Sequence, residues 1–217
     1  MNGMRARTQR EVDHAMSTGV DLLEVYGHNI VIRGCAVPRV RILGGSVECV
    51  DTNIEQVTGS ADVKSLGSTT IRSVGGHATL WAGEHSLVGF IIDHARAYNI
   101  TGQASVDEVG GDAVIEAVSG ESHIGTIHSG SVRFVFGNSS IDSIEDARVD
   151  CISGNATVGH VGEQSLVNLL SHSARVIRLD GTIRRMCESS CVVTRGYHGR
   201  IGSREDNSLV LREILTE

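Results

Sequence analysis

The sequence predicts an all-β fold: a β-solenoid (β-helix) of stacked strand units, each eight or nine residues long, with a short α-helical cap at its N-terminal end. A polar–Ala–x–aliphatic unit recurs along most of the chain, as in Asp146–Val149 and Asn155–Val158. Neighbouring units follow at steps of eight or nine residues, which the 3.6-residue period of a helix does not produce. The chain has three Phe, three Tyr and one Trp in 217 residues, so its core must be slender.

The spacing inside each unit predicts a short strand. The small residue and the first aliphatic residue are two positions apart, as are side chains on one face of a strand. Gly, Ser, Asn and Asp between the units predict turns. Because one such strand cannot bury its apolar side alone, the units must stack. The predicted inward anchors are Val47, Ile54, Val63, Ile71, Leu80, Val88, Val106, Val114, Val132, Ile141, Val149, Val158, Val167, Val176 and Ile183.

The sequence predicts the number of strands in one coil less clearly than it predicts the strands themselves. Two units would give a coil of about 17 residues and three a coil of about 26. A row of polar residues at a spacing of 17 slightly favours two strands per coil; its members are Glu121, Asn138, Asn155 and His172. Asp146 and Glu163 occupy the same slot in the units between those residues, so the row discriminates poorly. At about 4.8 Å per coil, two strands per coil predict a solenoid about 40 Å tall, whereas three strands per coil predict one shorter than about 30 Å.

Residues 1–20 are predicted to contain the capping helix. Thr8 and Glu11 match the S/T-x-x-E capping box, and Gly19 is a natural helix end. The helix places three apolar residues on one face: Val12, Ala15 and Met16. Such a helix would cover the strand edge at the end of the solenoid.

The solenoid is expected over residues 21–186. Its least regular part is 85–98, where Phe90, Ile91 and Ile92 predict a lateral bulge or an outward apolar patch. After Ile183 the repeat degrades, so residues 187–217 are expected to form a loop or a modified coil, followed by a segment that closes the solenoid or docks on another subunit.

Charge is unevenly distributed. Residues 1–45 contain six Arg and four acidic residues, 46–170 five Lys and Arg against sixteen acidic residues, and 171–217 eight Arg against six. The acidic middle disfavours a nucleic-acid partner on the solenoid faces. The sequence shows neither a transmembrane run nor a secretory signal, so we expect no membrane partner and a location in a host cytoplasm or a virion.

Five carboxylates in the middle of the repeat form a candidate acidic interaction patch: Asp107, Glu108, Asp112, Glu116 and Glu121. Glycosidases use paired carboxylates, but enzymes that cleave polysaccharides also bring aromatic platforms for the sugar rings, and aromatic residues are scarce here. The phosphate-binding loop, the zinc-protease helix and the serine nucleophile elbow are missing from the sequence. We therefore predict a protein that is not an enzyme and assign it no catalytic or cofactor-binding residue and no cofactor.

Three histidines, His77, His85 and His94, lie near predicted turns. With two units per coil, His77 and His94 would be one coil apart and could share a metal, but a third ligand is not evident, so we predict exposed turn histidines and no metal site. The five cysteines are an odd, scattered set rather than a disulfide framework. Cys187 and Cys191 lack a second pair for a metal site, and most cysteines are predicted to be small buried residues.

The units Asp146–Val149, Asn155–Val158, His77–Leu80 and Ser173–Val176 resemble the x-Ala-x-Val repeats of β-solenoid proteins encoded by actinobacterial phages. The opening Thr8–Gly19 also resembles the start of such proteins, and the likeness covers most of the chain except 85–100 and the part after 183. Members of this group mostly lack an assigned function.

The resemblance implies a phage setting. On that basis we expect a structural or binding solenoid that decorates a capsid or belongs to a tail, and contacts virion subunits or further copies of itself as a homo-oligomer. Two alternatives remain open: a solenoid that binds or cleaves a glycan, and an acidic DNA mimic that acts in host takeover.

Overall fold

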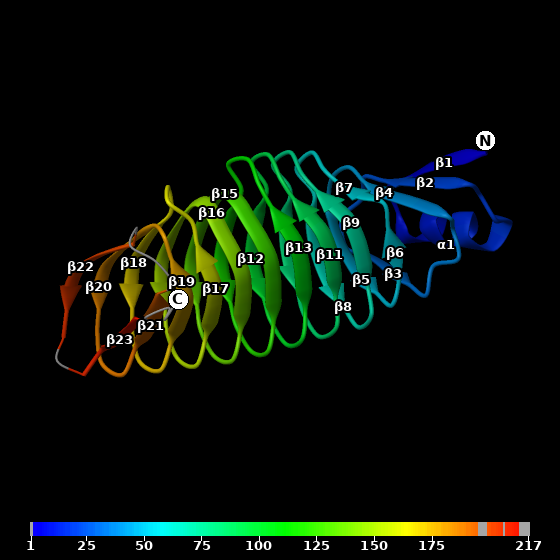
Figure 1. Ribbon diagram of the computed structural model, residues 1–217. Coiled ribbons are helices and arrows are strands. Elements are labelled where there is room, and N and C mark those ends of the chain that lie inside the picture. The colour runs from blue at the N-terminus through cyan, green and yellow to red at the C-terminus, as the bar shows by residue number, and fades with distance from the viewer. Residues whose placement is uncertain (1, 195–198, 206, 213–217) are drawn as a thin grey trace, which may run out of the picture.

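The computed structural model describes residues 2–194, 199–205 and 207–212. Its parallel strands stack into an elongated β-solenoid of about 12 turns, with the N-terminal helix at one end (Figure 1). The predicted fold class is thereby confirmed. Within the described ranges, no helix has the length and hydrophobicity needed to cross a membrane.

Most coils contribute one strand to each of two faces. Face A consists of β1 (Gly3–Ala6), β2 (Leu22–Val25), β4 (Arg39–Ile42), β6 (Asn53–Ile54), β7 (Gln56–Val57), β9 (Thr70–Val74), β11 (Leu87–Ile91), β13 (Ser105–Val109), β17 (Thr157–Val161), β19 (Arg175–Leu179), β21 (Cys191–Thr194) and β23 (Leu209–Arg212). Face B consists of β3 (Ile30–Arg33), β5 (Ser46–Val50), β8 (Asp62–Leu66), β10 (Thr79–Ala82), β12 (Arg96–Ile100), β14 (Val114–Val118), β18 (Leu166–Leu170), β20 (Thr182–Met186) and β22 (Arg200–Arg204). The long strands β15 (His123–Val135) and β16 (Ser140–Ile152) run along face A and continue round a corner onto face B.

The strand register confirms two units per coil. Ser140 pairs with His123 on the preceding coil and with Thr157 on the following coil. The sequence separation of His123 and Ser140 is 17, as expected for two strand units and their turns. About 12 turns at a rise of about 4.8 Å give a length of about 58 Å, more than the predicted 40 Å, because the ladder extends beyond both ends of the clear repeat.

The core is the slender aliphatic column that the sequence predicts. In β13 the inward residues are Val106 and Val109, three positions apart, and the two residues between them face solvent. The predicted anchors are buried with one exception. Val114 is half-buried and Ile115 is the fully buried residue, because Ile115 lies two positions after the inward Ala113.

The N-terminal cap forms as predicted. α1 (Gln9–Thr18) begins with the reciprocal Thr8–Glu11 capping box and ends at Gly19, whose φ is 68°. The side chain of Gln9 accepts a hydrogen bond from the backbone N–H of Val31 at 2.7 Å and donates one to its carbonyl at 2.9 Å. The helix therefore satisfies backbone groups on the edge of β3 that faces away from β5.

Residues 1–20 are nevertheless not helix alone. β1 precedes the helix and pairs in parallel with β2, so the ladder begins with Gly3. Ala6 in β1 is fully buried, as are two residues of the helix, Val12 and Ala15, and Met16 packs against the core. The N-terminal segment thus combines a cap with the first rung of the solenoid.

The parallel ladder continues beyond residue 186, where the sequence places the end of the regular solenoid, so of the two expectations for this part the modified coil is the one that forms. β21 and β23 continue face A and β22 continues face B, all in parallel register. Aliphatic residues that pack on the core recur at nine-residue steps, at Val192, Ile201 and Val210, so the repeat persists beyond residue 186. The loop predicted at Gly196–His198 and the final residues 213–217 lie outside the described residues.

Many of the corners between the two faces have the same type of turn. In the turn of Gly110–Ala113, Gly111 has a φ of 69°, Asp112 points outward and Ala113 is fully buried. Other inward turn positions hold Ser, and the Ser122 hydroxyl donates to the Ser119 carbonyl at 2.7 Å. Small side chains are required because the two faces converge at these corners.

Candidate binding sites on the two faces

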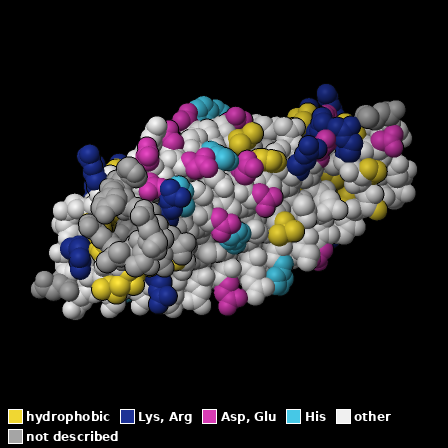
Figure 2. All heavy atoms as spheres, viewed as in Figure 1, with side chains coloured by type: hydrophobic (Ala, Val, Ile, Leu, Met, Phe, Trp, Pro, Cys, Tyr) yellow, Lys and Arg dark blue, Asp and Glu magenta, His cyan; other side chains and the backbone are white. Residues whose placement is uncertain are grey.

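The surface keeps the charge separation found in the sequence. Figure 2 shows Asp, Glu and His side chains over the middle of the visible face, and Lys and Arg gathered towards both ends. The middle of the rod and its two ends therefore differ in electrostatic character, which matters for the orientation of a charged partner.

The five carboxylates of the predicted acidic patch do not come together. Asp107 and Glu108 are exposed on β13 of face A, whereas Glu116 lies on β14 of face B. Asp112 and Glu121 lie in turns at the two opposite edges of the coil. The nine-residue step from one strand to the next moves the chain to the other face, so carboxylates that are close in sequence become separated.

Glu116 and Glu121 have close polar partners on neighbouring coils. Glu116 lies 3.2 Å from Nε of Arg96 and 2.9 Å from a guanidinium nitrogen of Arg133. Glu121 accepts a hydrogen bond from the side chain of Gln103 at 3.0 Å. These contacts favour a structural role for Glu116, because two guanidinium groups offset its charge.

The predicted proximity of His77 and His94 is confirmed. Their rings stack one coil apart, with centroids 5.3 Å apart and planes 11° apart. Nδ1 of His94 lies 3.4 Å from Oδ2 of Asp112 on the next coil, while His85 lies in a turn at the opposite edge. In the part of the chain that the structure describes, no three His, Cys, Asp or Glu residues form a group suited to a metal ion.

Face A carries a second set of histidines, paired with carboxylates between coils. Nδ1 of His128 lies 2.7 Å from Oε2 of Glu145, and its Nε2 lies 3.5 Å from Oε2 of Glu108. Nε2 of His123 lies 3.3 Å from Oδ2 of Asp142. These pairs are not among the contacts expected from the sequence, although the separation of the partners along the chain is close to one coil length and could have revealed them.

A Ser–His–Asp row also crosses face A. Oγ of Ser143 lies 3.4 Å from Nδ1 of His160, whose Nε2 lies 3.0 Å from Oδ2 of Asp180. Arg178 donates to the same Oδ2 from Nε at 2.8 Å. Burial raises the pKa of the Asp180 carboxyl, but the bonds from His160 and Arg178 outweigh it and hold that pKa below its usual value.

This row resembles a hydrolase triad in composition only. Arg178 shares the carboxylate that would otherwise serve the imidazole alone. The strands that carry Ser143 and His160, β16 and β17, are each paired with coils on both sides, so their amides are engaged in the ladder instead of facing a substrate oxyanion. We interpret the row as polar contacts between successive coils.

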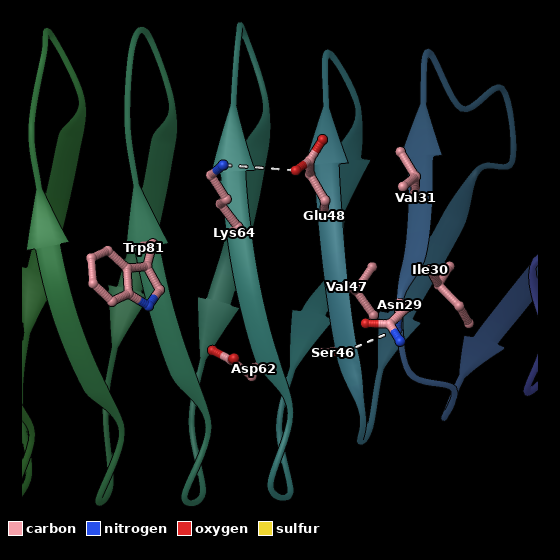
Figure 3. Close-up of a pocket in the computed structure, with 9 residues that line it drawn as sticks. All are labelled: Asn29, Ile30, Val31, Ser46, Val47, Glu48, Asp62, Lys64 and Trp81. Atoms are coloured by element: carbon pink, nitrogen blue, oxygen red, sulfur yellow. Dashed lines mark hydrogen bonds and ion pairs between the residues drawn. The ribbon is translucent and has the colours of Figure 1, made fainter.

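Face B contains an open groove with a volume of about 490 Å³. Figure 3 shows Trp81 at one end and Val31 near the other, with Lys64 and Glu48 along one side and Asp62 along the other. Nζ of Lys64 lies 3.8 Å from Oε2 of Glu48. The full lining is Asn29, Ile30, Val31, Ser46, Val47, Glu48, Asp62, Lys64 and Trp81.

Trp81 belongs to an aromatic stack that the sequence analysis did not foresee. Its ring lies on that of Tyr98 one coil further on, with centroids 5.2 Å apart. The guanidinium carbon of Arg96 lies 5.8 Å from the Tyr98 centroid. The stack forms at a register shift, where Leu80 pairs with Ala97 but Trp81 pairs with Asn99, so face B lengthens by one residue.

All five cysteines are free thiols. Cys49 and Cys187 are buried and the other three are half-buried, so the prediction of mostly buried cysteines holds for two. Burial raises the pKa of the Cys49 thiol to about 12. Cys187 lies in a turn and Cys191 begins β21.

Comparison with family models, curated proteins and solved structures finds no match to this chain. What the protein does must therefore be inferred from its own residues and their geometry.

Proposed function

We propose that this protein is a non-enzymatic β-solenoid that serves as a rigid structural or binding component of a phage particle, as a capsid decoration or a tail-associated part. The observation that carries the proposal is one continuous parallel ladder of about 12 turns, with α1 covering its first coils. Outward side chains in such a ladder stand in straight rows about 4.8 Å apart. A rod of this kind can present a fixed pattern of groups to a partner surface without rearrangement.

The charge pattern supports a defined orientation on the particle. Basic groups gather towards both ends of the rod and acidic groups over its middle (Figure 2). Complementary charge steers the encounter and fixes which surface meets the partner. Asp107 and Glu108, both exposed on face A, suit a basic surface on a virion subunit or on a second copy of the chain.

The test is quantitative mass spectrometry of particles purified through a density gradient. The proposal expects this chain at a fixed ratio to the major capsid or tail subunit in every gradient fraction that contains particles. A phage replication protein from the same lysate serves as the control that must be depleted. Absence of the chain from particles, or a ratio that changes with further washing, overturns the virion assignment.

The binding surface can be tested with charge variants. The double substitution Asp107→Asn, Glu108→Gln removes two exposed carboxylates from face A, whereas Asp146→Asn removes one at an edge. The double variant should bind disassembled particle subunits more weakly, and the edge variant should bind like the wild type. Equal binding by all three proteins would show that this part of face A does not contact the partner.

A further inference from the structure

We propose that the groove on face B is a binding site for a neutral oligosaccharide. The groove spans four successive strands of face B, β3, β5, β8 and β10, and hence three coil steps. At about 4.8 Å per step its length is about 14 Å, which accommodates roughly three pyranose rings of an extended chain. This site is separate from the proposed place in a particle, and neither proposal depends on the other.

The aromatic end of the groove supplies the apolar contact that a sugar ring needs. Trp81 is 43 % exposed, so much of its ring is accessible. Tyr98 stacks against it, and Arg96 in turn lies over Tyr98 and 3.2 Å from Glu116. The indole is therefore held in place before a ligand arrives, which lowers the entropy cost of binding. The C–H face of a pyranose can pack on such a ring.

The sides of the groove supply both donors and acceptors. Lys64 and Glu48 form one side, with side chains 57 % and 32 % exposed, so their polar ends remain accessible. On the other side, Oδ1 of Asp62 accepts a hydrogen bond from Oγ1 of Thr79 at 2.5 Å, which orients the carboxylate. Sugar hydroxyls donate and accept, so a mixture of carboxylates and an ammonium group suits them.

The same features argue against other ligand classes. A peptide strand would need an open sheet edge, but β5 and β8 are each hydrogen-bonded to strands on both sides. Nucleic acid would need a basic surface, whereas the charged side chains of the lining are two carboxylates, Glu48 and Asp62, and one ammonium group, Lys64. The near balance of charge favours an uncharged ligand.

Trp81 is the only tryptophan of the chain, so its fluorescence reports on this site alone. The probes are cellotriose, maltotriose and N-acetylated chitotriose, with a hyaluronan tetrasaccharide as the anionic comparison. We expect a saturable change in Trp81 emission with at least one neutral trisaccharide and weaker binding of hyaluronan. An emission unchanged by all three neutral trisaccharides overturns the proposal, and tighter binding of hyaluronan overturns the assignment of a neutral ligand.

Variants show whether a bound sugar occupies the groove. Calorimetry and saturation-transfer NMR replace fluorescence here, because Trp81→Ala removes the reporter. Trp81→Ala and Asp62→Asn should each weaken binding about tenfold or more, a loss of about 1.4 kcal/mol or more. Phe134→Ala is the matched control, since Phe134 is an exposed aromatic residue on face B outside the groove. Wild-type affinity in correctly folded Trp81→Ala and Asp62→Asn proteins would exclude the groove as the site.

Discussion

Nε of Arg41 lies 2.8 Å from Oε2 of Glu55 on the adjacent coil of face A. A guanidinium nitrogen of Arg39 lies 2.9 Å from the other carboxylate oxygen, so one carboxylate joins two arginines of β4. Hydrogen bonds from Arg39 and then Arg41 lower the pKa of Glu55 to about 2. Glu55 separates the short strands β6 and β7, so this contact holds an irregular part of the ladder in register.

Glu55→Gln should therefore destabilise the protein in a pH-dependent way. The pKa of Glu55 is about 2 in the folded chain against 4.5 for an unperturbed Glu. Its ionised form thus stabilises the fold above about pH 4.5, and the contribution is lost as the pH falls towards 2. At pH 7 we expect a loss of up to about 1 kcal/mol in unfolding free energy.

Urea denaturation of both proteins at pH 7 and pH 3 measures this difference. Glu163→Gln, at an exposed turn position, is the control and should change little at either pH. If Glu55→Gln lowers the free energy of unfolding by the same amount at both pH values, the proposed role of the carboxylate is contradicted.

Ala95→Leu should destabilise the solenoid by overpacking. Ala95 is fully buried in a corner turn, and Ala78 and Ala113 occupy the same inward position on the coils before and after it. A larger side chain there must displace one of the faces, at a cost of about 1–3 kcal/mol. Thermal and urea unfolding measure the loss, with Gln164→Leu at an exposed turn position as control. Equal stability of the two variants would show that the corner has room.

Two turn substitutions test the left-handed backbone at one corner of the coil, where a Cβ at Gly154 would also lie 3.0 Å from the backbone nitrogen of Gly137. Gly154 has a φ of 68° and His172, in the turn one coil further on, a φ of 56°. Gly154→Val places a β-branched residue in the left-handed region of backbone conformation. This substitution should lower the free energy of unfolding by about 1–3 kcal/mol. His172→Gly relieves such strain but increases the conformational entropy of the unfolded chain. The free energy of unfolding should therefore change by no more than about 1 kcal/mol. A larger loss in His172→Gly than in Gly154→Val would reverse this interpretation.

Cys49 should resist alkylation in the folded protein. Burial raises the pKa of its thiol to about 12, so almost no thiolate forms near pH 8 and the reagent cannot reach it. Brief treatment with iodoacetamide followed by peptide mass spectrometry should show modification of the half-buried Cys151 and protection of Cys49. Urea should abolish the protection. Modification of both cysteines at one rate under native conditions would contradict the buried placement.

Much of the fold could be predicted because its determinants are local. The Thr8–Glu11 capping box and the left-handed Gly19 define α1 within a few residues. The nine-residue rhythm of small and aliphatic residues implied stacked strands, and the two-strand coil then placed His77 beside His94. The continuation of the ladder was missed since Val192 and Val210 have apolar neighbours, among them Val193, Leu209 and Leu211, that obscure which aliphatic residue faces inward.

The sequence by itself determined nearly all of the residues that face the core, because the spacing of small and aliphatic residues and the turn chemistry act within a single unit. Tertiary structure alone decided which outward residues meet, as with Trp81 and Tyr98 or His160 and Asp180. The partners in each pair come from successive coils, and one extra residue in a coil shifts the outward neighbours while the core pattern is preserved. Contacts between coils depend on the accumulated register of the whole stack, which a local pattern does not contain.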